Sequence, residues 1–151
     1  MSASISRPEA TSWLSSLLRG RPHQIIGPAG DPYMRRWFLL PHNKFANLYL
    51  HAFTASDDPD ALHNHPWSFV SIMLRGSYIE HTEHGTRTRR AGSVVVRPAR
   101  FYHRIEIPTG ASSRCWTLVI TGPKVQHWGF RCRSGRLVPW TQFGGGCGED
   151  Q

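Results

Sequence analysis

The sequence predicts an all-β chain, a single antiparallel jelly-roll β-barrel with one short helix in front of it. From about residue 33 onward, short runs rich in Val, Ile, Trp, Phe, Tyr and Thr favour strands. The breaks between these runs carry Gly, Pro, Asn and Asp, which favour turns. About eight such runs at roughly even spacing are typical of an antiparallel barrel or jelly roll.

The chain is long enough for one domain, because 151 residues can bury a substantial core. We expect residues 1–32 to hold a helix and a lead-in, and residues 33–143 to form the barrel. Residues 144–151 begin with three glycines, and we expect them to be a flexible tail.

The predicted helix covers residues 11–19, with Thr11 or Ser12 as its N-cap and Gly20 as its end. Its apolar stripe consists of Trp13, Leu14, Leu17 and Leu18. The predicted strands are residues 36–40, 45–53, 67–75, 77–83, 93–97, 102–107, 115–121 and 126–132.

Composition limits the partners and the location. No apolar run is long enough to span a membrane, and the N-terminus lacks the pattern of a signal peptide. Cys115, Cys132 and Cys147 are an odd number without CxxC spacing, so we expect reduced cysteines in a cytoplasmic protein. The net charge of +8 comes mostly from scattered arginines. We therefore favour a solvated basic surface over a nucleic-acid or other anionic partner, which is the alternative.

Candidate chemistry is concentrated at His63-Asn64-His65. On an extended chain, side chains two residues apart point the same way, roughly 6.5–7 Å from each other. Two imidazoles can therefore reach one metal ion, with about 2.0–2.1 Å from each nitrogen to the metal. A third ligand must come from elsewhere, and His103 is the candidate. The alternative is that these histidines are ordinary polar residues of the barrel interior.

Strand alternation extends this hypothesis to neighbouring residues. If His65 points inward, then Phe69 and Met73 line the same interior. The intervening positions of residues 70–74 are also apolar, so something has to cover the outer face. Either the N-terminal helix or a second copy of the chain could do so, and we favour a homodimer.

Further anchors follow the histidine pair at characteristic spacings, and with them the sequence resembles the cupin superfamily over residues 45–122. Two motifs define that superfamily, G-x5-HxH-x3/4-E-x6-G and G-x5-PxG-x2-H-x3-N. The anchors present in this chain are His63, His65, Gly76, Gly92, Pro98 and His103. The anchors replaced by other residues are at Asp57, Phe69, Arg100 and Ile107.

Phe69 stands where these proteins carry the glutamate that completes the metal site. The resemblance therefore implies a site of three neutral histidines, His63, His65 and His103. Such a site leaves positions open for a substrate and dioxygen.

Within the superfamily, the chain resembles the cysteine-dioxygenase-like thiol dioxygenases, which use a three-histidine ferrous site. Tyr33-Met34-Arg35 is similar to the Tyr-x-Arg with which those enzymes hold the substrate carboxylate. An arginine next to Arg36 on the surface is the alternative interpretation of Arg35. The Ser-x-His-x-Tyr relay of those enzymes is missing, since the matching positions are Trp116, Leu118 and Ile120.

Two further groups of residues are candidates for the site. Tyr49 and His51 share one face of their strand, which is either the pocket wall or the solvated side of an edge strand. Tyr102 precedes His103 and is the candidate catalytic residue, with simple packing as the alternative.

Taken together, these features predict a metal-dependent protein, most specifically a mononuclear non-haem Fe(II) oxygenase with a small anionic substrate and dioxygen as partners. The predicted substrate-binding residues are Tyr33, Arg35, Tyr49, His51, Phe69 and Met73. A lyase or isomerase that uses Zn, Ni or Mn as a Lewis acid is one alternative. A binding module without enzymatic activity is the other.

Overall fold

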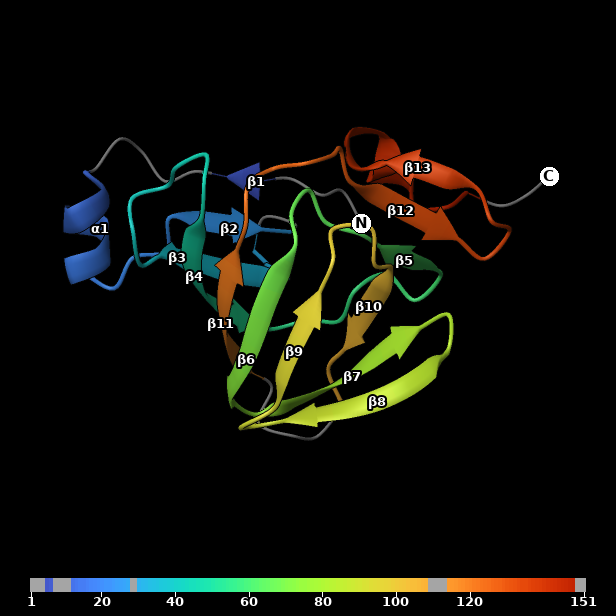
Figure 1. Ribbon diagram of the computed structural model, residues 1–151, viewed down its shortest axis with the longest axis horizontal. Coiled ribbons are helices and arrows are strands. Elements are labelled where there is room, and N and C mark those ends of the chain that lie inside the picture. Colours follow the sequence, from blue (N-terminus) through green and yellow to red (C-terminus); the bar gives the residue numbers. More distant parts are fainter. Residues whose placement is uncertain (1–4, 7–11, 28–29, 109–113, 149–151) are drawn as a thin grey trace.

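The structure is a computed structural model that describes residues 5–6, 12–27, 30–108 and 114–148. Two antiparallel sheets enclose the interior, with a short helix at one end and a 3-10 helix near the C-terminus (Figure 1). The predicted all-β jelly roll with a short N-terminal helix is confirmed.

Each sheet combines strands from distant parts of the chain. The seven-stranded sheet has the order β1 (Ile5–Ser6), β2 (Gln24–Ile26), β3 (Met34–Phe38), β4 (Asn47–Phe53), β11 (Cys115–Thr121), β6 (Phe69–Arg75) and β9 (Val94–Arg97). The six-stranded sheet has the order β13 (Leu137–Pro139), β12 (Gly129–Cys132), β5 (Ala61–His63), β10 (His103–Glu106), β7 (Ser77–Thr82) and β8 (Gly85–Arg90). The helices are α1 (Trp13–Leu18) and η1 (Trp140–Gly145).

The inner faces of the strands follow the predicted alternation. On β6, Phe69, Ser71 and Met73 are buried, and on the neighbouring β11, Thr117 and Val119 are buried opposite them. These side chains point into the space between the sheets, which brings residues from both sheets together there. The largest apolar cluster in the described part of the chain consists of Met34, Phe53, Met73, Tyr78, Ile105 and Cys115.

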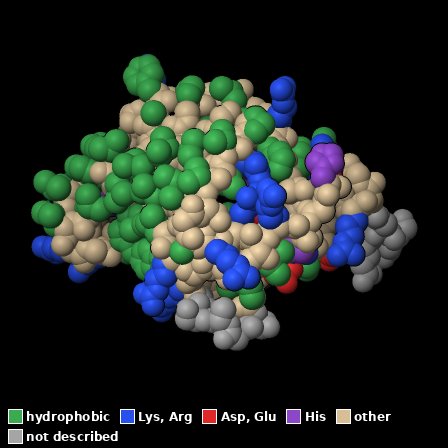
Figure 2. Space-filling model, turned by 60° about the horizontal axis from the view of Figure 1, so that its bottom comes forward, with side chains coloured by type: hydrophobic (Ala, Val, Ile, Leu, Met, Phe, Trp, Pro, Cys, Tyr) green, Lys and Arg blue, Asp and Glu red, His purple; other side chains and the backbone are tan. Residues whose placement is uncertain are grey.

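Helix α1 begins after Ser12, whose hydroxyl accepts a hydrogen bond from the backbone N–H of Ser15, so Ser12 is the N-cap. The helix lies beside β3, where the Trp13 indole donates to the carbonyl of Phe38. Leu14 and Leu18 are exposed, so only part of the predicted apolar stripe packs inward. Hydrophobic side chains remain exposed over the half of the molecule that holds the seven-stranded sheet (Figure 2).

Strand β8 is absent from the predicted set because its sequence, Gly-Thr-Arg-Thr-Arg-Arg, lacks apolar alternation. It pairs with β7 along its whole length and forms the edge of the six-stranded sheet. Charged side chains on an edge strand discourage pairing with other chains, which accounts for a polar sequence in this position.

The cysteines correct a prediction. Cys132 on β12 and Cys147, which follows η1, form a disulfide, whereas Cys115 is free and buried. Sequence spacing could not reveal this pair, because β12 and η1 are brought together only by the fold. Disulfides persist mainly in oxidising compartments, so the cysteines no longer support a reducing location.

In the described part of the chain, no helix has the length and apolar character needed to cross a membrane.

Candidate metal centre and cavity

Three histidines converge between the sheets, as the sequence predicts. His63 on β5 and His103 on β10 are direct partners across two neighbouring antiparallel strands. His65 lies two residues beyond His63, and its ring centre is 5.0 Å from that of His63 and 5.2 Å from that of His103. One ring nitrogen from each histidine lies within 4.8 Å of the others.

The distance between the facing nitrogens of His65 and His103 suits a single metal ion. Two nitrogen ligands at 2.1 Å from an ion and at a right angle are about 3.0 Å apart. His65 Nε2 and His103 Nε2 are 2.9 Å apart. Burial lowers the pKa of His63 to about 4, with an opposing effect from Asp57, and burial also lowers the pKa of His65. Both rings are therefore neutral near pH 7, as ligand histidines must be.

Glu80 on β7 fixes the orientation of His103. The Nδ1–H of His103 donates to Glu80 Oε1 at 3.0 Å, which leaves the Nε2 lone pair free to face the other histidines. A carboxylate bonded to the far nitrogen of a histidine is the usual support of a metal ligand.

Two arginines hold Glu80 in turn. Arg89 of β8 and Arg97 of β9 donate to its carboxylate at 2.8–3.1 Å, and Glu80 itself is only 1% exposed. Burial alone would raise the pKa of Glu80, but hydrogen bonds from His103, Arg97 and Arg89 outweigh it and hold the pKa well below its usual range. The charged carboxylate is thus permanently available to His103.

The other two histidines are positioned differently. His65 stacks on Trp67 and meets the edge of Phe69, with ring centres 5.1 and 4.7 Å away. Gln126 donates from its side chain to the carbonyl of His65 and so anchors the segment that follows β5. His63 Nδ1 lies 3.6 Å from the carboxylate of Asp57, within reach of its charge but too far for a hydrogen bond.

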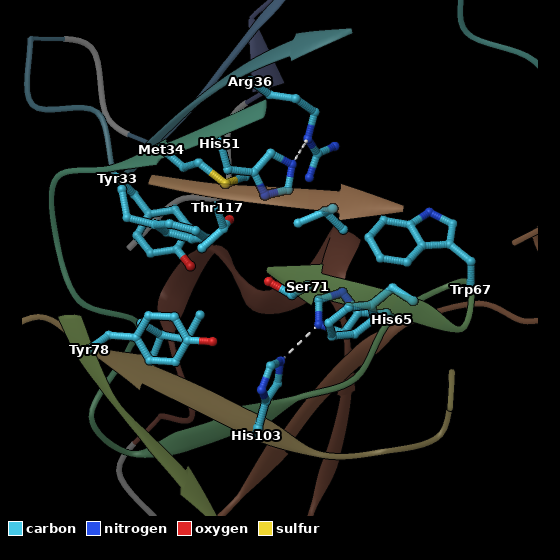
Figure 3. Close-up of a pocket in the computed structure, with 14 residues that line it drawn as sticks. Tyr33, Met34, Arg36, His51, His65, Trp67, Ser71, Tyr78, His103 and Thr117 are labelled. Carbon is cyan, nitrogen blue, oxygen red and sulfur yellow. Dashed lines mark hydrogen bonds between the residues drawn. The ribbon is translucent and has the colours of Figure 1, made fainter. Parts of the chain in front are cut away.

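A cavity of about 70 Å³ opens beside His65 and His103 (Figure 3). It is lined by Tyr33, Met34, Arg36, His51, Phe53, His65, Trp67, Phe69, Ser71, Tyr78, His103, Ile105, Thr117 and Val119. Most of this surface is apolar or aromatic, so a ligand inside would be largely shielded from water.

The cavity includes some of the predicted substrate-binding residues and not others. Tyr33, His51 and Phe69 line it. Arg35, Tyr49 and Met73 do not, and neither does Tyr102, the predicted catalytic residue.

The residues outside the lining have other surroundings. Tyr49 and Met73 are buried in apolar clusters, and Tyr102 lies against the guanidinium of Arg131, 4.0 Å from the ring centre. Roles in binding or catalysis for these residues and Arg35 stay predictions.

Arg36, not Arg35, is the arginine of the cavity. Arg36 is the direct cross-strand partner of His51, and its Nε donates to His51 Nε2 at 2.9 Å. Its Nη1 donates to Gln24 Oε1 at 3.0 Å, and its guanidinium lies over the ring of Tyr49. No acidic residue of the described chain forms an ion pair with it. Burial lowers the pKa of Arg36.

Hydroxyl groups complete the polar part of the lining. Thr117 is 1% exposed, and its hydroxyl has no hydrogen-bond partner among the described residues. Tyr78 directs its hydroxyl into the cavity (Figure 3). Burial raises the pKa of Tyr78, and burial together with a hydrogen bond to Asp57 raises the pKa of Tyr33, so both phenols stay protonated at neutral pH.

The three residues matched to the Ser-x-His-x-Tyr relay do not face the cavity. Trp116, Leu118 and Ile120 alternate with the buried Thr117 and Val119, so they lie on the outer face of β11. The inward residues of this strand that reach the cavity are Thr117 and Val119. The relay is therefore absent from the cavity on either choice of register.

The sequence patterns did not identify five residues that belong to the site or support it, namely Arg36, Glu80, Arg89, Arg97 and Gln126. Glu80 carried a usable signal, because it is the single acidic residue in the run from Ser77 to Thr82 and shares the inward parity of Tyr78. Arg36 was ambiguous, since both faces of β3 carry an arginine and large apolar side chains.

No protein-family model matches the chain, and no curated protein matches it significantly. Solved structures do resemble it. The polyketide cyclase RemF from Streptomyces resistomycificus is 17% identical, over 62% of this chain and 72% of its own, with a TM-score of 0.51. An RmlC-like cupin protein from Ralstonia eutropha is 15% identical, over 78% of this chain and 73% of its own, with a TM-score of 0.52.

The DMSP lyase DddQ from Ruegeria pomeroyi is 17% identical with a TM-score of 0.52, over 66% of this chain but only 52% of the lyase. At such identities the likeness concerns the fold alone, and it gives no support to the cysteine-dioxygenase-like subgroup. What the comparisons and the two-sheet architecture establish together is that this chain has the cupin fold.

Proposed function

We propose that the chain is a metal-dependent enzyme that holds one divalent ion through His63, His65 and His103 and oxidises a small carboxylate with dioxygen, with Fe(II) as the native metal. The observation that carries this proposal is the composition of one cavity. His65 and His103, two of the three histidines that could hold a metal, line one side of it, and Arg36, which has no acidic partner among the described residues, lines the other (Figure 3).

Arg36 supports an anionic substrate. Its Nε and Nη1 have acceptors in His51 and Gln24, which leaves Nη2 without a side-chain acceptor among the described residues. A guanidinium removed from water is stabilised by a carboxylate, and Nη2 is the group that remains to donate to it. The free hydroxyl of Thr117 adds a second polar group in the same lining.

The cavity limits the size of the substrate. A cavity of about 150 Å³ can hold benzene, which has six non-hydrogen atoms. A volume of about 70 Å³ therefore encloses only part of a molecule of that size, so the substrate should be a small carboxylate.

The choice of reaction follows from what the lining lacks. No aspartate or glutamate lines the cavity in the described part of the chain, and its tyrosines are held protonated. The lone pair of His51 Nε2 is engaged by Arg36. Apart from the metal-binding histidines, no side chain is poised to take a proton, which disfavours lyase and isomerase reactions that begin with a protein base.

Ferrous iron, when bound, would supply a centre at which dioxygen and substrate exchange electrons. The chain's own residues supply the remaining functions. Arg36 would hold the carboxylate, while Trp67 and Phe69 exclude water beside His65. Glu80 would keep His103 in the tautomer that presents Nε2.

The test is dioxygen consumption by protein reconstituted anaerobically with Fe(II), screened against small carboxylates that carry a thiol, hydroxyl or amino group. Arg36→Met should raise the KM for a turned-over carboxylate strongly, whereas Arg35→Met, on the opposite face of β3, should not. Turnover by the Zn, Ni or Mn form without dioxygen would replace this proposal with the lyase or isomerase. Metal binding without any turnover would leave a binding module.

A further inference from the structure

A broad apolar surface covers the outside of the seven-stranded sheet, away from the cavity. Val70 and Ile72 of β6 lie between Val94 and Val96 of β9 and Leu118 and Ile120 of β11. We call these six residues the outer apolar face. Val70 pairs with Val96 on one side and with Ile120 on the other. Ile72 pairs with Val94 and with Leu118 in the same way. The six side chains therefore form two adjacent rows on one side of the sheet.

This face departs from the usual polarity of an antiparallel sheet. Such sheets commonly place apolar residues inside and polar residues in water. Here Phe69, Met73 and Val119 are buried on the inner side. The outer side is apolar as well, with Val94, Val96 and Ile120 59%, 67% and 44% exposed. Leu74, further along β6, is 48% exposed and extends the patch. Contiguous apolar surface of this kind on a folded chain marks an interaction site.

Helix α1 does not cover the face. It contacts β3, on the far side of β4 and β11 from β6 (Figure 1). Hydrophobic side chains lie open over this half of the molecule, with Lys and Arg at the margins (Figure 2). The sequence suggested that either the N-terminal helix or a second copy of the chain covers this face, and the helix is therefore excluded.

We infer that the outer apolar face is the contact surface of a homodimer, in which two copies of the chain stack their seven-stranded sheets face to face. The face carries no charge of its own, so two copies can meet there without placing like charges opposite each other, despite a net charge of +8 per chain. A twofold contact requires a surface that complements itself, and a flat uncharged sheet meets that requirement.

The area of the sheet is consistent with a stable contact. Strand β4 adjoins β11, and its outward residues Leu48, Leu50 and Ala52 are uncharged, so it continues the face. Neighbouring strands are about 4.8 Å apart with a rise of about 3.3 Å per residue, so the four strands β4, β11, β6 and β9, with about six residues each, project roughly 400 Å². Side chains standing on the sheet increase the accessible area toward the roughly 800 Å² per partner of a standard interface.

The test is the molar mass in solution, measured by light scattering and sedimentation over roughly 1–100 μM, because dimer stability depends on protomer concentration. The wild-type chain should have twice the monomer mass of 17.1 kDa. The double variant Val94→Glu/Val96→Glu should weaken the dimer by about a hundredfold or more, because each copy would bury unpaired charges. Both positions are more than half exposed in one copy, so the folded monomer tolerates the change.

The matched control is Val125→Glu/Leu137→Glu, which adds the same charges at apolar positions that are 66% and 61% exposed and lie outside the face. This control should remain dimeric. A wild-type monomer at the highest concentration would overturn the inference, and so would a dimer that the face variant leaves intact. A monomer that floats with vesicles of anionic lipid would assign the face to a membrane instead.

Discussion

Replacing Glu80 by glutamine tests how the candidate metal centre is held. Glutamine keeps the shape of the side chain but removes the charge that faces three donors, His103, Arg89 and Arg97. The amide can present only one oxygen, so its NH2 group must face at least one guanidinium. We expect His103 to lose its fixed orientation, and the two arginines to lose their only acidic partner in the described chain.

The effect on metal binding should be tenfold to a hundredfold. Loss of a hydrogen-bonded support behind a metal-binding histidine typically weakens affinity by about 10- to 100-fold. This corresponds to about 1.4–2.7 kcal/mol, and titration against a competing chelator can resolve it.

The metal-free protein should also lose stability. Removing one partner from a buried ion pair costs about 3–5 kcal/mol. Glu80 is 1% exposed, while the side chains of Arg89 and Arg97 are 14% and 17% exposed, so we expect the lower end, about 3 kcal/mol. For a chain of this size the melting temperature should fall by about 6–12 °C.

Glu106→Gln is the matched control. Glu106 also accepts a hydrogen bond from a histidine, His81, at 2.8 Å, but its side chain is 41% exposed. An exposed pair of this kind contributes about 0–1 kcal/mol, and no effect on metal affinity is expected. Equal metal affinity in wild type, Glu80→Gln and Glu106→Gln would refute the role given to Glu80.

Three further predictions concern stability and the cavity. The pKa of His63 lies at about 4, below its ordinary 6.5, so between these pH values the unfolded chain binds more protons at this residue than the folded chain does. His63 alone should therefore cost the metal-free protein up to about 3 kcal/mol as the pH falls from about 6.5 to 4. Urea unfolding at several pH values measures this loss. His63→Gln should reduce the slope, and the buried His65 should account for part of what remains; an equal slope in the variant would contradict the prediction. Cys147→Ser removes a disulfide with a sequence separation of 15 and should lower the free energy of unfolding by about 3 kcal/mol. Reduction of the wild type should have the same effect, and a wild type whose stability does not change with reductant would argue against the bond. Thr117→Val removes a buried hydroxyl that has no partner among the described residues, so stability should be unchanged or higher while substrate binding weakens. Thr121→Val is the control, because it removes a similar hydroxyl outside the lining; it should have the same effect on stability and none on substrate binding. Equal substrate affinity in the wild type and both variants would exclude contact with Thr117.

The histidine cluster could be predicted from sequence because side chains two residues apart on a strand point to the same face. That periodicity places His63 and His65 on one side of an extended segment, and the cupin spacing supplied His103. The same alternation predicted that Phe69 and Met73 point inward; both are buried, and Phe69 lines the cavity. These features depend on the backbone geometry of one extended segment, which can be inferred from the residues of that segment alone.

The remaining parts of the site depend on contacts between distant strands. Glu80 reaches His103 only because β7 pairs with β10, and Arg89 reaches Glu80 because the polar β8 pairs with β7. The choice of Arg36 over Arg35 needed the register of β3 against β4. No periodicity within one segment determines such pairings, and the Cys132–Cys147 disulfide was missed for the same reason.

The most direct test of the central claim is the metal content of protein purified without chelator, compared with His63→Ala, His65→Ala and His103→Ala. The wild type should carry close to one divalent ion per chain, or take up one on exposure to Fe(II), Zn, Ni or Mn. Each variant should fold and carry none, because the remaining two imidazoles bind an ion far more weakly than three. Stoichiometric metal in any of the three variants, or a wild type that binds none of these ions, would contradict the assignment of this site.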